Sequence, residues 1–416
     1  MKKQYSFYFR NITISDAFYA LFFLISEFFP YNFIKVREKE LKKEIKKIFD
    51  FKKIYLFGSA RSSLYSLLKS LKFPKGSEIL LTGFTCDAVP NAIINAGYIP
   101  VYVDIKKSNY CMNPKKIKNK ISSKTKAIII QHTFGIPAEI DKIIKISKEF
   151  NLFTIEDCAL SLGSKFKNKF TGTFSDASIF TFELSKSFTT CWGGMLLLNS
   201  NKDNVINLMD DFYINVPLQS KKQKIKILFQ FTVSAFLYNP SIYILGKYII
   251  SIFFKLKIFS PSTSIIEKNA GLPSNYLYRL SDPQVNILYR QFLRFDSYLI
   301  KNEKLKNDYI KLFKCFLNDE LIKNINSKGV ILIRFPILTE NRSNIKELFY
   351  DENVELGEWF ISPISSNEIN HELFGYKFGS CHNSEFICKR IINLPLIYDY
   401  KRTIINKRLF SNLLKV

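Results

Sequence analysis

The sequence predicts an α/β protein with a large, mostly parallel sheet and a second, smaller α/β unit. From Ile54 to about Ser200, short apolar runs alternate with helical stretches, which is typical of strand–helix–strand units. Hydrophobic residues make up 47% of the chain, so fully disordered and fibrous proteins are excluded. At 416 residues the chain exceeds one ordinary core, so we expect more than one domain.

We expect residues 1–50 to form an N-terminal helical segment. The apolar run Ala17–Phe29 follows Ser15-Asp16, which has the composition of a helix N-cap. A glutamate interrupts this run and a proline closes it, so it is too short to span a bilayer, which takes ~20 apolar residues. Residues 37–49 have the pattern of a charged amphipathic helix.

Residues 51–310 are predicted to form the large domain that contains the sheet. The runs predicted as strands are Ile79–Thr82, Ile99–Val103, Ala127–Ile130, Phe153–Ile155, Ala177–Phe182 and Met195–Leu198. The predicted helices are Ser62–Leu71, Asp87–Ala96 and Ile140–Phe150, and a long helical pattern returns at 275–310. Such sheets bind ligands at the carboxyl ends of their strands, so reactive side chains are expected there.

An apolar helical insert, residues 213–265, interrupts the large domain. Ile227–Gly246 has no charged residue but contains Asn239-Pro240, and a proline breaks helical hydrogen bonding, so two shorter helices are favoured over one membrane span. Basic residues flank the run: Lys221, Lys222, Lys224, Lys226, Lys255 and Lys257. Two interpretations stay open, namely peripheral membrane contact through 221–257 and a buried helical hairpin or dimer contact.

Residues 311–416 are predicted to form a smaller C-terminal α/β domain. A strand is expected at Val330–Phe335 and a helix from about Asn344. Glycine, serine and proline runs are too sparse to predict a flexible linker, and no internal repeat is visible.

Net charge and cysteine usage indicate which partners and which cellular compartment to expect. The formal net charge is +25, but lysines are spread along the chain without a nucleic-acid-binding module, so we expect no nucleic-acid partner. An anionic membrane surface or a phosphorylated substrate would also suit this charge. The seven cysteines lack paired spacing and no secretory signal opens the chain, so we expect a cytoplasmic protein, peripheral at the inner membrane face if the insert binds lipid.

Three segments at strand ends combine a phosphate cradle, a carboxylate and an amine. Gly58–Leu64 joins a strand to a helix through small residues, and backbone N–H groups at a helix N-terminus bind phosphate. Glu156-Asp157 closes one apolar strand, and Thr181–Lys186 follows another, with Gly193-Gly194 leading into the next. Alone, these would be a helix start, a helix cap and a solvated lysine. Together they meet the needs of pyridoxal 5'-phosphate (PLP) chemistry.

The joint pattern resembles the DegT/DnrJ/StrS family of PLP-dependent sugar aminotransferases. The resemblance runs from about Gly58 to Ser200, resumes at Tyr276–Asp296 and closes with Ile392–Leu396. Its most particular matches are Pro74–Glu78, His132–Ala138, Glu156–Ala159, Gly172–Asp176 and Tyr278–Asp282. It implies PLP-dependent transferase fold type I, which is aspartate-aminotransferase-like, with PLP as the cofactor and a homodimer as the assembly.

The resemblance assigns roles to individual residues. Lys186 matches the family's Schiff-base lysine, and Asp157 matches the carboxylate at the pyridine nitrogen, where a neighbouring cation should keep it ionised. Thr181 matches the hydroxyl that binds the PLP phosphate. Ala60 and Arg61 match the Gly-Thr pair whose backbone N–H groups also bind it.

Several positions depart from the family pattern. Cys86 stands where an aromatic residue usually covers the cofactor ring, and thiol contact is weaker than aromatic stacking. Leu160 stands where Gln or His usually bonds the ring hydroxyl. Arg61, in place of Thr, would add a charge to the phosphate site.

The resemblance implies amino transfer, with glutamate as the donor and a nucleotide-linked keto-sugar as the acceptor, for surface polysaccharide or lipopolysaccharide biosynthesis. Lys186 would move the proton in each half-reaction. One alternative is a PLP-dependent sugar dehydratase, against which Lys186 argues because such relatives have His there. The other is a non-catalytic, membrane-associated scaffold of the same fold, motivated by Cys86, Leu160 and the insert.

We expect no metal site. His132 lies in a family-like strand end and is a candidate to face the ligand. The group Cys381, His382 and Cys388 lacks a fourth ligand at zinc spacing.

Overall fold

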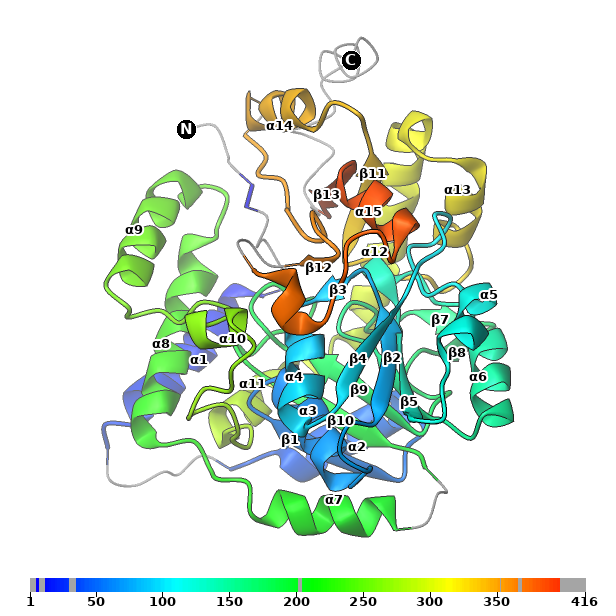
Figure 1. The fold of residues 1–416 in the computed structure, drawn as a ribbon. Coiled ribbons are helices and arrows are strands. Elements are labelled where there is room, and N and C mark those ends of the chain that lie inside the picture. The colour runs from blue at the N-terminus through cyan, green and yellow to red at the C-terminus, as the bar shows by residue number, and fades with distance from the viewer. Residues whose placement is uncertain are drawn as a thin grey trace.

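A seven-stranded sheet forms the centre of the computed structural model, which describes residues 5–6, 12–29, 35–200, 204–351, 353–365 and 369–396. Its strands are β1 (Lys53–Phe57), β2 (Glu78–Thr82), β4 (Ile99–Val103), β5 (Thr125–Gln131), β6 (Phe153–Asp157), β9 (Ala177–Thr181) and β10 (Gly194–Leu198). They lie in the order β1-β10-β9-β6-β5-β2-β4, with helices on both faces (Figure 1).

The sheet is mostly parallel, which confirms the predicted fold class. β4, β2, β5, β6 and β9 pair in parallel, whereas β10 pairs antiparallel with both β9 and β1. The parallel strands are almost entirely buried, because helices cover both faces. Their carboxyl ends meet at one edge of the sheet.

Alternate side chains of each strand enter two separate core layers. In β10, Leu196 and Leu198 face one layer, while Met195 and Leu197 face the other. The first layer packs under α3 (Ala60–Ser70), α4 (Ala88–Ala96) and α7 (Val205–Ile214). The opposite face packs against α2 (Glu38–Ile48), α6 (Ile140–Glu149), α11 (Asp282–Phe292) and the start of α12 (Phe295–Phe313).

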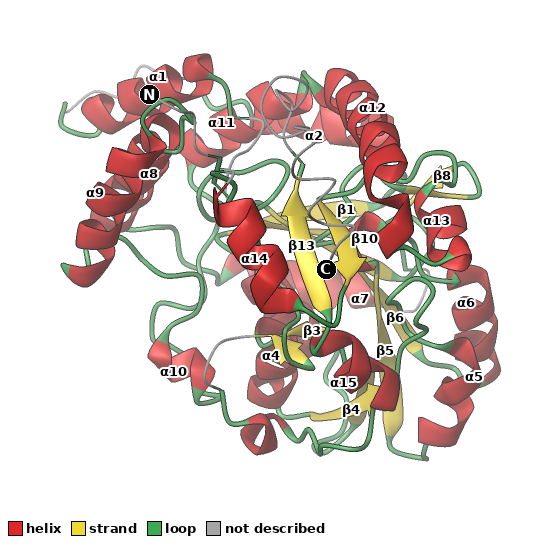
Figure 2. Ribbon diagram, turned by 90° about the horizontal axis from the view of Figure 1, so that it is seen from above, coloured by secondary structure: helices red, strands yellow, loops and turns green. Residues whose placement is uncertain are grey.

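A second core surrounds the antiparallel pair β11 (Arg334–Leu338) and β13 (Ile391–Pro395). The end of α12 packs into it, together with α13 (Asp319–Ile325), α14 (Arg342–Asp351) and α15 (His382–Cys388), as seen from above in Figure 2. The short strand β12 (Ile364–Ser365) joins the two regions by pairing with β3 (Thr85–Cys86). The domain limits proposed from the sequence stay a prediction.

Shorter elements complete the chain. They are α5 (Pro114–Ile117), α10 (Ile265–Lys268), the hairpin β7 (Lys165–Phe166) and β8 (Lys169–Phe170), and single 3-10 turns at Lys118–Lys120, Thr133–Gly135, Lys314–Phe316 and His371–Phe374.

Two local predictions are wrong. The first helix, α1 (Ile14–Ser26), has Thr13 as its N-cap, and Asp16 is the third helical residue, which closes a capping box with Thr13. The strand predicted at Val330–Phe335 begins only at Arg334. The N–H of Ile331 donates to Ser164 Oγ and that of Ile333 to the carbonyl of Phe134, so this apolar run is buried without ladder pairing.

The apolar insert forms two helices, α8 (Lys221–Leu237) and α9 (Tyr243–Lys255), which are separated at Asn239-Pro240. α1 and α9 each contact α8. None of the helices in the described part of the chain combines the length and the hydropathy that crossing a bilayer requires.

Candidate active site

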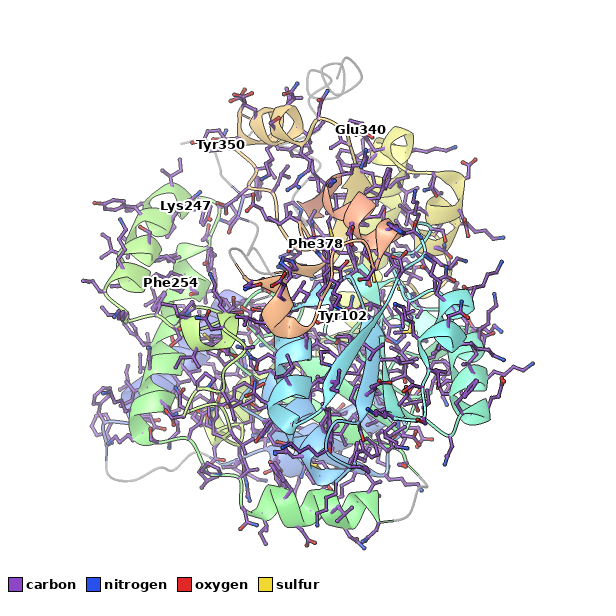
Figure 3. The ribbon with its side chains drawn as sticks, viewed as in Figure 1. Tyr102, Lys247, Phe254, Glu340, Tyr350 and Phe378 are labelled. Carbon is purple, nitrogen blue, oxygen red and sulfur yellow. The ribbon has the colours of Figure 1, made fainter. Side chains whose placement is uncertain are left out.

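A cavity of about 1260 Å³ lies at the carboxyl-end edge of the sheet, and all six residues predicted to bind the cofactor line it. These are Ala60, Arg61, Cys86, Asp157, Thr181 and Lys186. α9 and α14 supply further walls. Figure 3 labels Lys247 of α9 and Tyr350 of α14, which line the cavity from these two elements.

The phosphate cradle predicted from the sequence is built by three adjacent segments. Gly194 of β10 is the register partner of Thr181 on one side and of Phe57 on the other. A Cβ at residue 194 would lie 2.4 Å from the N atom of Ala60, so only glycine lets β10 approach the start of α3 this closely. The first N–H groups of a helix have no partner within it, and Ala60 and Arg61 open α3.

Asp157 is the last residue of β6, and strand alternation turns it away from Glu156 and toward the cavity. Its Oδ1 accepts a 3.0 Å hydrogen bond from the N–H of Ala159. Burial raises the pKa of Asp157 above its ordinary value, and the N–H of Ala159 and the ammonium of Lys186 oppose that rise only in part. The expectation that a neighbouring cation fixes its ionisation is therefore incomplete, because burial is the larger influence.

Lys186 lies in a turn that follows β9. Its N–H donates to the carbonyl of Glu183 at 2.9 Å, and its Nζ lies 4.2 Å from the centroid of the Trp359 ring. Trp359 comes from the segment between α14 and β12. The next residue, Phe360, stacks on Phe84 with 4.6 Å between ring centroids and holds this segment beside the Cys86 loop. An aromatic ring thus reaches the cavity from a segment that the sequence did not indicate.

The side chain of Arg61 makes its contacts outside the phosphate cradle. Its guanidinium forms an ion pair with Glu267 of α10 and donates to the carbonyl oxygen of Ser262. It also lies 5.5 Å from the centroid of the Trp192 ring. The charge predicted to strengthen phosphate binding is therefore compensated by a carboxylate, because Glu267 and Arg61 are both largely shielded from water.

Cys86 and Leu160, two of the departures from the family pattern, both line the cavity. The thiol of Cys86 donates to Asp87 Oδ1 at 3.1 Å, while Asp87 Oδ2 is buried without a hydrogen-bond partner among the described residues. Burial, with the nearby Asp87 carboxylate, raises the pKa of the Cys86 thiol well above its ordinary value. Leu160 offers only an apolar surface.

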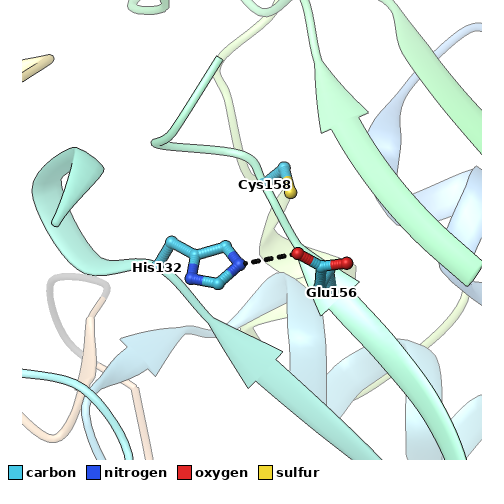
Figure 4. A group of neighbouring side chains, drawn as sticks. All are labelled: His132, Glu156 and Cys158. Carbon is cyan, nitrogen blue, oxygen red and sulfur yellow. Dashed lines mark hydrogen bonds and ion pairs between the residues drawn. The ribbon is translucent and has the colours of Figure 1, made fainter. Parts of the chain in front are cut away.

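His132 does not face the cavity; it belongs to a buried group with Glu156 and Cys158, whose possible ligand atoms lie within 4.8 Å of one another (Figure 4). His132 Nε2 lies 3.1 Å from Glu156 Oε1, and its Nδ1 accepts from the N–H of Ala138. The Glu156 carboxylate also accepts from the N–H groups of Gly172, Phe174 and Ser175. These hydrogen bonds give the group a structural role, because they hold the end of β6 against the neighbouring loops.

Three residues of the cavity wall were missed in the sequence. Trp192 and Trp359 are the chain's two tryptophans, and both line the cavity. Trp192 directly precedes the Gly193-Gly194 motif, and so rare a residue at this place was a sequence signal that could have identified it. Asp87 follows Cys86 directly and resembles an ordinary helix cap. No local signal could place Trp359, because long-range contacts, namely the β3–β12 pairing and the stacking of Phe360 on Phe84, bring its segment to the site.

Comparisons with known proteins agree with this geometry. The model of the DegT/DnrJ/EryC1/StrS aminotransferase family matches residues 36–223 and 258–407. The uncharacterized protein MJ1066 of Methanocaldococcus jannaschii is 29% identical over 350 residues, which cover 81% of this chain and 79% of that protein. GDP-perosamine synthase of Escherichia coli O157:H7 is 40% identical over 137 residues, which cover 33% of this chain and 38% of that enzyme.

A solved structure has the same fold over nearly the whole chain. PseC of Helicobacter pylori, described as an aminotransferase involved in the biosynthesis of pseudoaminic acid, aligns with a TM-score of 0.68 and 20% sequence identity. The alignment covers 99% of each chain. The large sheet and the helices around it are therefore those of known aminotransferases.

Proposed function

The chain belongs to the DegT/DnrJ/EryC1/StrS aminotransferase family, and we propose that it transfers an amino group from glutamate to a keto-sugar carried on a nucleotide. The enzyme is PLP-dependent, as the family is. The observation that carries the proposal is the meeting of Lys186, Asp157 and the Ala60–Thr181 cradle in one cavity. The product would be an amino sugar for surface polysaccharide or lipopolysaccharide.

The residues present fit the cofactor. Because residue 194 is glycine, β10 approaches the start of α3 closely, and Thr181 is the register partner of Gly194. We propose that the phosphate binds between the first N–H groups of α3 and the Thr181 hydroxyl. The Lys186 amine would hold the cofactor covalently, and the Asp157 carboxylate would keep its ring nitrogen protonated. When bound, PLP supplies an electron sink for the carbon that gains or loses a proton.

The chain's own residues then have distinct tasks. Lys186 Nζ, once released, would take a proton from the donor's carbon and deliver it to the cofactor carbon, and the reverse transfer would complete amination of the sugar. Asp157 would stay ionised with the cofactor bound, because a protonated ring nitrogen beside it would favour the carboxylate. The ring of Trp359, which already contacts the Lys186 ammonium, would limit where that amine can move.

The remaining cavity suits a nucleotide-linked sugar. Aromatic side chains line it, namely Tyr238 just after α8, Tyr243 and Phe254 of α9, and Tyr350 of α14. Lys247, Lys268 and Lys346 add positive charge, of which Lys247 and Lys346 are paired with Glu355 and Glu358. We propose that a base stacks on the aromatic wall and that the lysines face the diphosphate.

The acceptor sugar and the assembly belong to the same proposal. Lys186 favours amino transfer over dehydration, because the dehydrating relatives have His at this position. A homodimer is expected from the family, and light scattering of the purified protein would measure its mass.

The test combines a spectrum with product analysis. Purified protein should absorb at the edge of the visible range, and Lys186→Ala should lose both this band and the activity. Mass spectrometry of products from a panel of nucleotide keto-sugars, with and without glutamate, identifies the acceptor. Failure to bind PLP at micromolar concentration would favour the non-catalytic scaffold, and turnover without glutamate would favour dehydration.

A further inference from the structure

Three helices, α1, α8 and α9, lie side by side on one flank of the molecule, at the left of Figures 1 and 2. α1 and the three residues that follow it carry an apolar stripe, which we define as Ile14, Phe18, Phe22, Ile25, Phe28 and Phe29. The first four of these recur every three or four residues, so they share one helical face. Each of the six side chains is at least half exposed.

The opposite face of α1 packs against the rest of the protein, so the apolar stripe is not the face by which α1 joins the core. Ala17, Ala20 and Phe23 are buried, and the last two join a small core with Ile227 and Phe231 of α8. The ring of Phe18 meets Phe236 of α8 edge-on at 5.6 Å between centroids. The exposed apolar surface of α1 is therefore continuous with α8.

α9 adds a second exposed apolar surface. Ile244, Leu245 and Tyr248 are each more than half exposed, as is Leu256 just beyond the helix. The inner face of α9 lines the active-site cavity through Tyr243, Lys247, Ile250 and Phe254. Its outer residues can thus be substituted without touching the cavity wall.

The charge of this flank is one-sided. Residues 212–266 contain seven lysines and no Asp or Glu. The two acidic residues of the α1 region point inward: Asp16 pairs with Arg294 at 2.6 Å, and Glu27 pairs with Lys224 at 3.5 Å. Both carboxylates are buried or nearly so. Among the described residues, Lys224 and Lys247 are paired with Glu27 and Glu355, whereas the other five lysines have no ion-pair partner. The exposed apolar side chains here are therefore accompanied by net positive charge.

We infer that α1, α8 and α9 form a docking surface for an anionic lipid bilayer. Amphipathic helices that combine aromatic and aliphatic side chains with lysines insert shallowly at the headgroup boundary. Each lysine near an anionic surface adds to the attraction. The inferred membrane-binding surface is larger than the segment 221–257 expected from the sequence, because the apolar stripe supplies most of its exposed aromatic rings.

A second copy of the chain fits this flank less well than a bilayer does. In a two-fold symmetric contact the same surface meets itself, so lysines of 221–257 would approach lysines, and this segment contains no Asp or Glu to offset them. Anionic headgroups would neutralise the same charges. The test therefore separates these two partners.

The experiment is flotation of the full-length protein with vesicles of phosphatidylcholine alone or mixed with phosphatidylglycerol. The unmodified protein should float with the anionic vesicles, and high salt should weaken this binding, because salt screens exposed charges. Phe22→Ser/Ile25→Ser/Phe29→Ser should lower the bound fraction at least about tenfold, and Lys222→Gln/Lys255→Gln should lower it on anionic vesicles alone.

A matched control removes equally exposed apolar side chains elsewhere. Ile300 and Phe378 are 71% and 67% exposed, and Ile300→Ser/Phe378→Ser should bind vesicles like the unmodified protein. Figure 3 shows Phe378 away from the three helices. Absence of binding to anionic vesicles, or a stripe variant that instead halves the mass in light scattering, would overturn the inference. The cofactor band of every variant reports separately on the proposed function.

Discussion

The Nζ of Lys186 lies 4.2 Å from the centroid of the Trp359 ring, although these two residues are 173 positions apart in the chain. Lys186 follows β9 of the central sheet, whereas Trp359 lies between α14 and β12. An ammonium over an indole face is attracted by roughly 0.5–2 kcal/mol. The second region of the protein therefore touches the reactive amine directly, and it supplies an aromatic surface that Cys86 does not.

Cofactor binding should quench most of the protein's tryptophan fluorescence. Trp192 and Trp359 are the only tryptophans in the sequence and both line the cavity, so a bound pyridine ring would accept their excitation energy. Titration of PLP into cofactor-free protein measures this. Trp192→Phe and Trp359→Phe should each retain quenching of the remaining ring. If the fluorescence of either single variant is unchanged when PLP saturates its absorbance band, the tryptophan that remains in that variant does not face the cofactor.

The sequence predicted the sheet and three of its strand ends because those features are local. Strand alternation and small-residue turns placed Thr181, Asp157 and Lys186 at one edge, and the structure brings them together. The contacts of Arg61 with Glu267 and of Lys186 with Trp359 could not be predicted, since each joins residues more than 150 positions apart. The apolar run at 330–333 misled for a related reason, because periodicity reports burial and not ladder pairing.

Asp157→Asn should stabilise the cofactor-free protein while lowering its activity. Burial raises the pKa of Asp157, so folding favours the protonated carboxyl. That contribution is present at acidic pH and is lost as pH rises through the folded pKa, which leaves an unfavourable buried charge at neutral pH. Asn removes the charge, so Tm at neutral pH should rise by a few degrees, with little change under acidic conditions.

The catalytic half of this prediction is measured with cofactor-loaded protein. Loss of the carboxylate at the ring nitrogen should lower kcat by roughly 10²–10³, which is typical of a lost electrostatic contact at a reacting group. Asp176→Asn is a suitable control, since Asp176 directly precedes β9 and its carboxylate accepts hydrogen bonds from Thr154 outside the cavity. An unchanged kcat in Asp157→Asn would remove this residue from the mechanism.

Cys86 should react slowly with iodoacetamide although it is open to the cavity. Although Cys86 is exposed to the cavity, the protein around its thiol and the Asp87 carboxylate raise the pKa of that thiol, and the thiolate is the reactive form. Asp87→Asn removes the neighbouring charge and should speed alkylation of Cys86 severalfold at mildly alkaline pH. Peptide mass spectrometry follows Cys86 against the fully buried Cys111 in the same sample. Equal rates in both proteins would show that Asp87 has no influence on the thiol.

Breaking the ion pair of Arg61 and Glu267 should destabilise the protein yet free a charge for the cradle. Both side chains are largely shielded, and removal of one partner of such a pair costs about 3–5 kcal/mol. Glu267→Gln should therefore lower Tm but tighten binding of inorganic phosphate to cofactor-free protein. Arg61→Met should lower Tm without the gain in phosphate affinity. The double variant separates the pair's coupling from its individual costs.

Glu156→Gln should lower activity without removing any group that lines the cavity. The Glu156 carboxylate accepts from Gly172, Phe174 and Ser175, and it contacts His132 at 3.1 Å. An amide presents donors where these N–H groups need acceptors, so the end of β6 should shift and Asp157 with it. A shift of about 1 Å in a catalytic group can cost roughly 10²-fold in rate. Steady-state kinetics should therefore show a lower kcat, and the pH dependence of the cofactor band should move, because its ring nitrogen depends on Asp157. A lower Tm with an unchanged band and unchanged kcat would restrict Glu156 to holding the loop at residues 172–175.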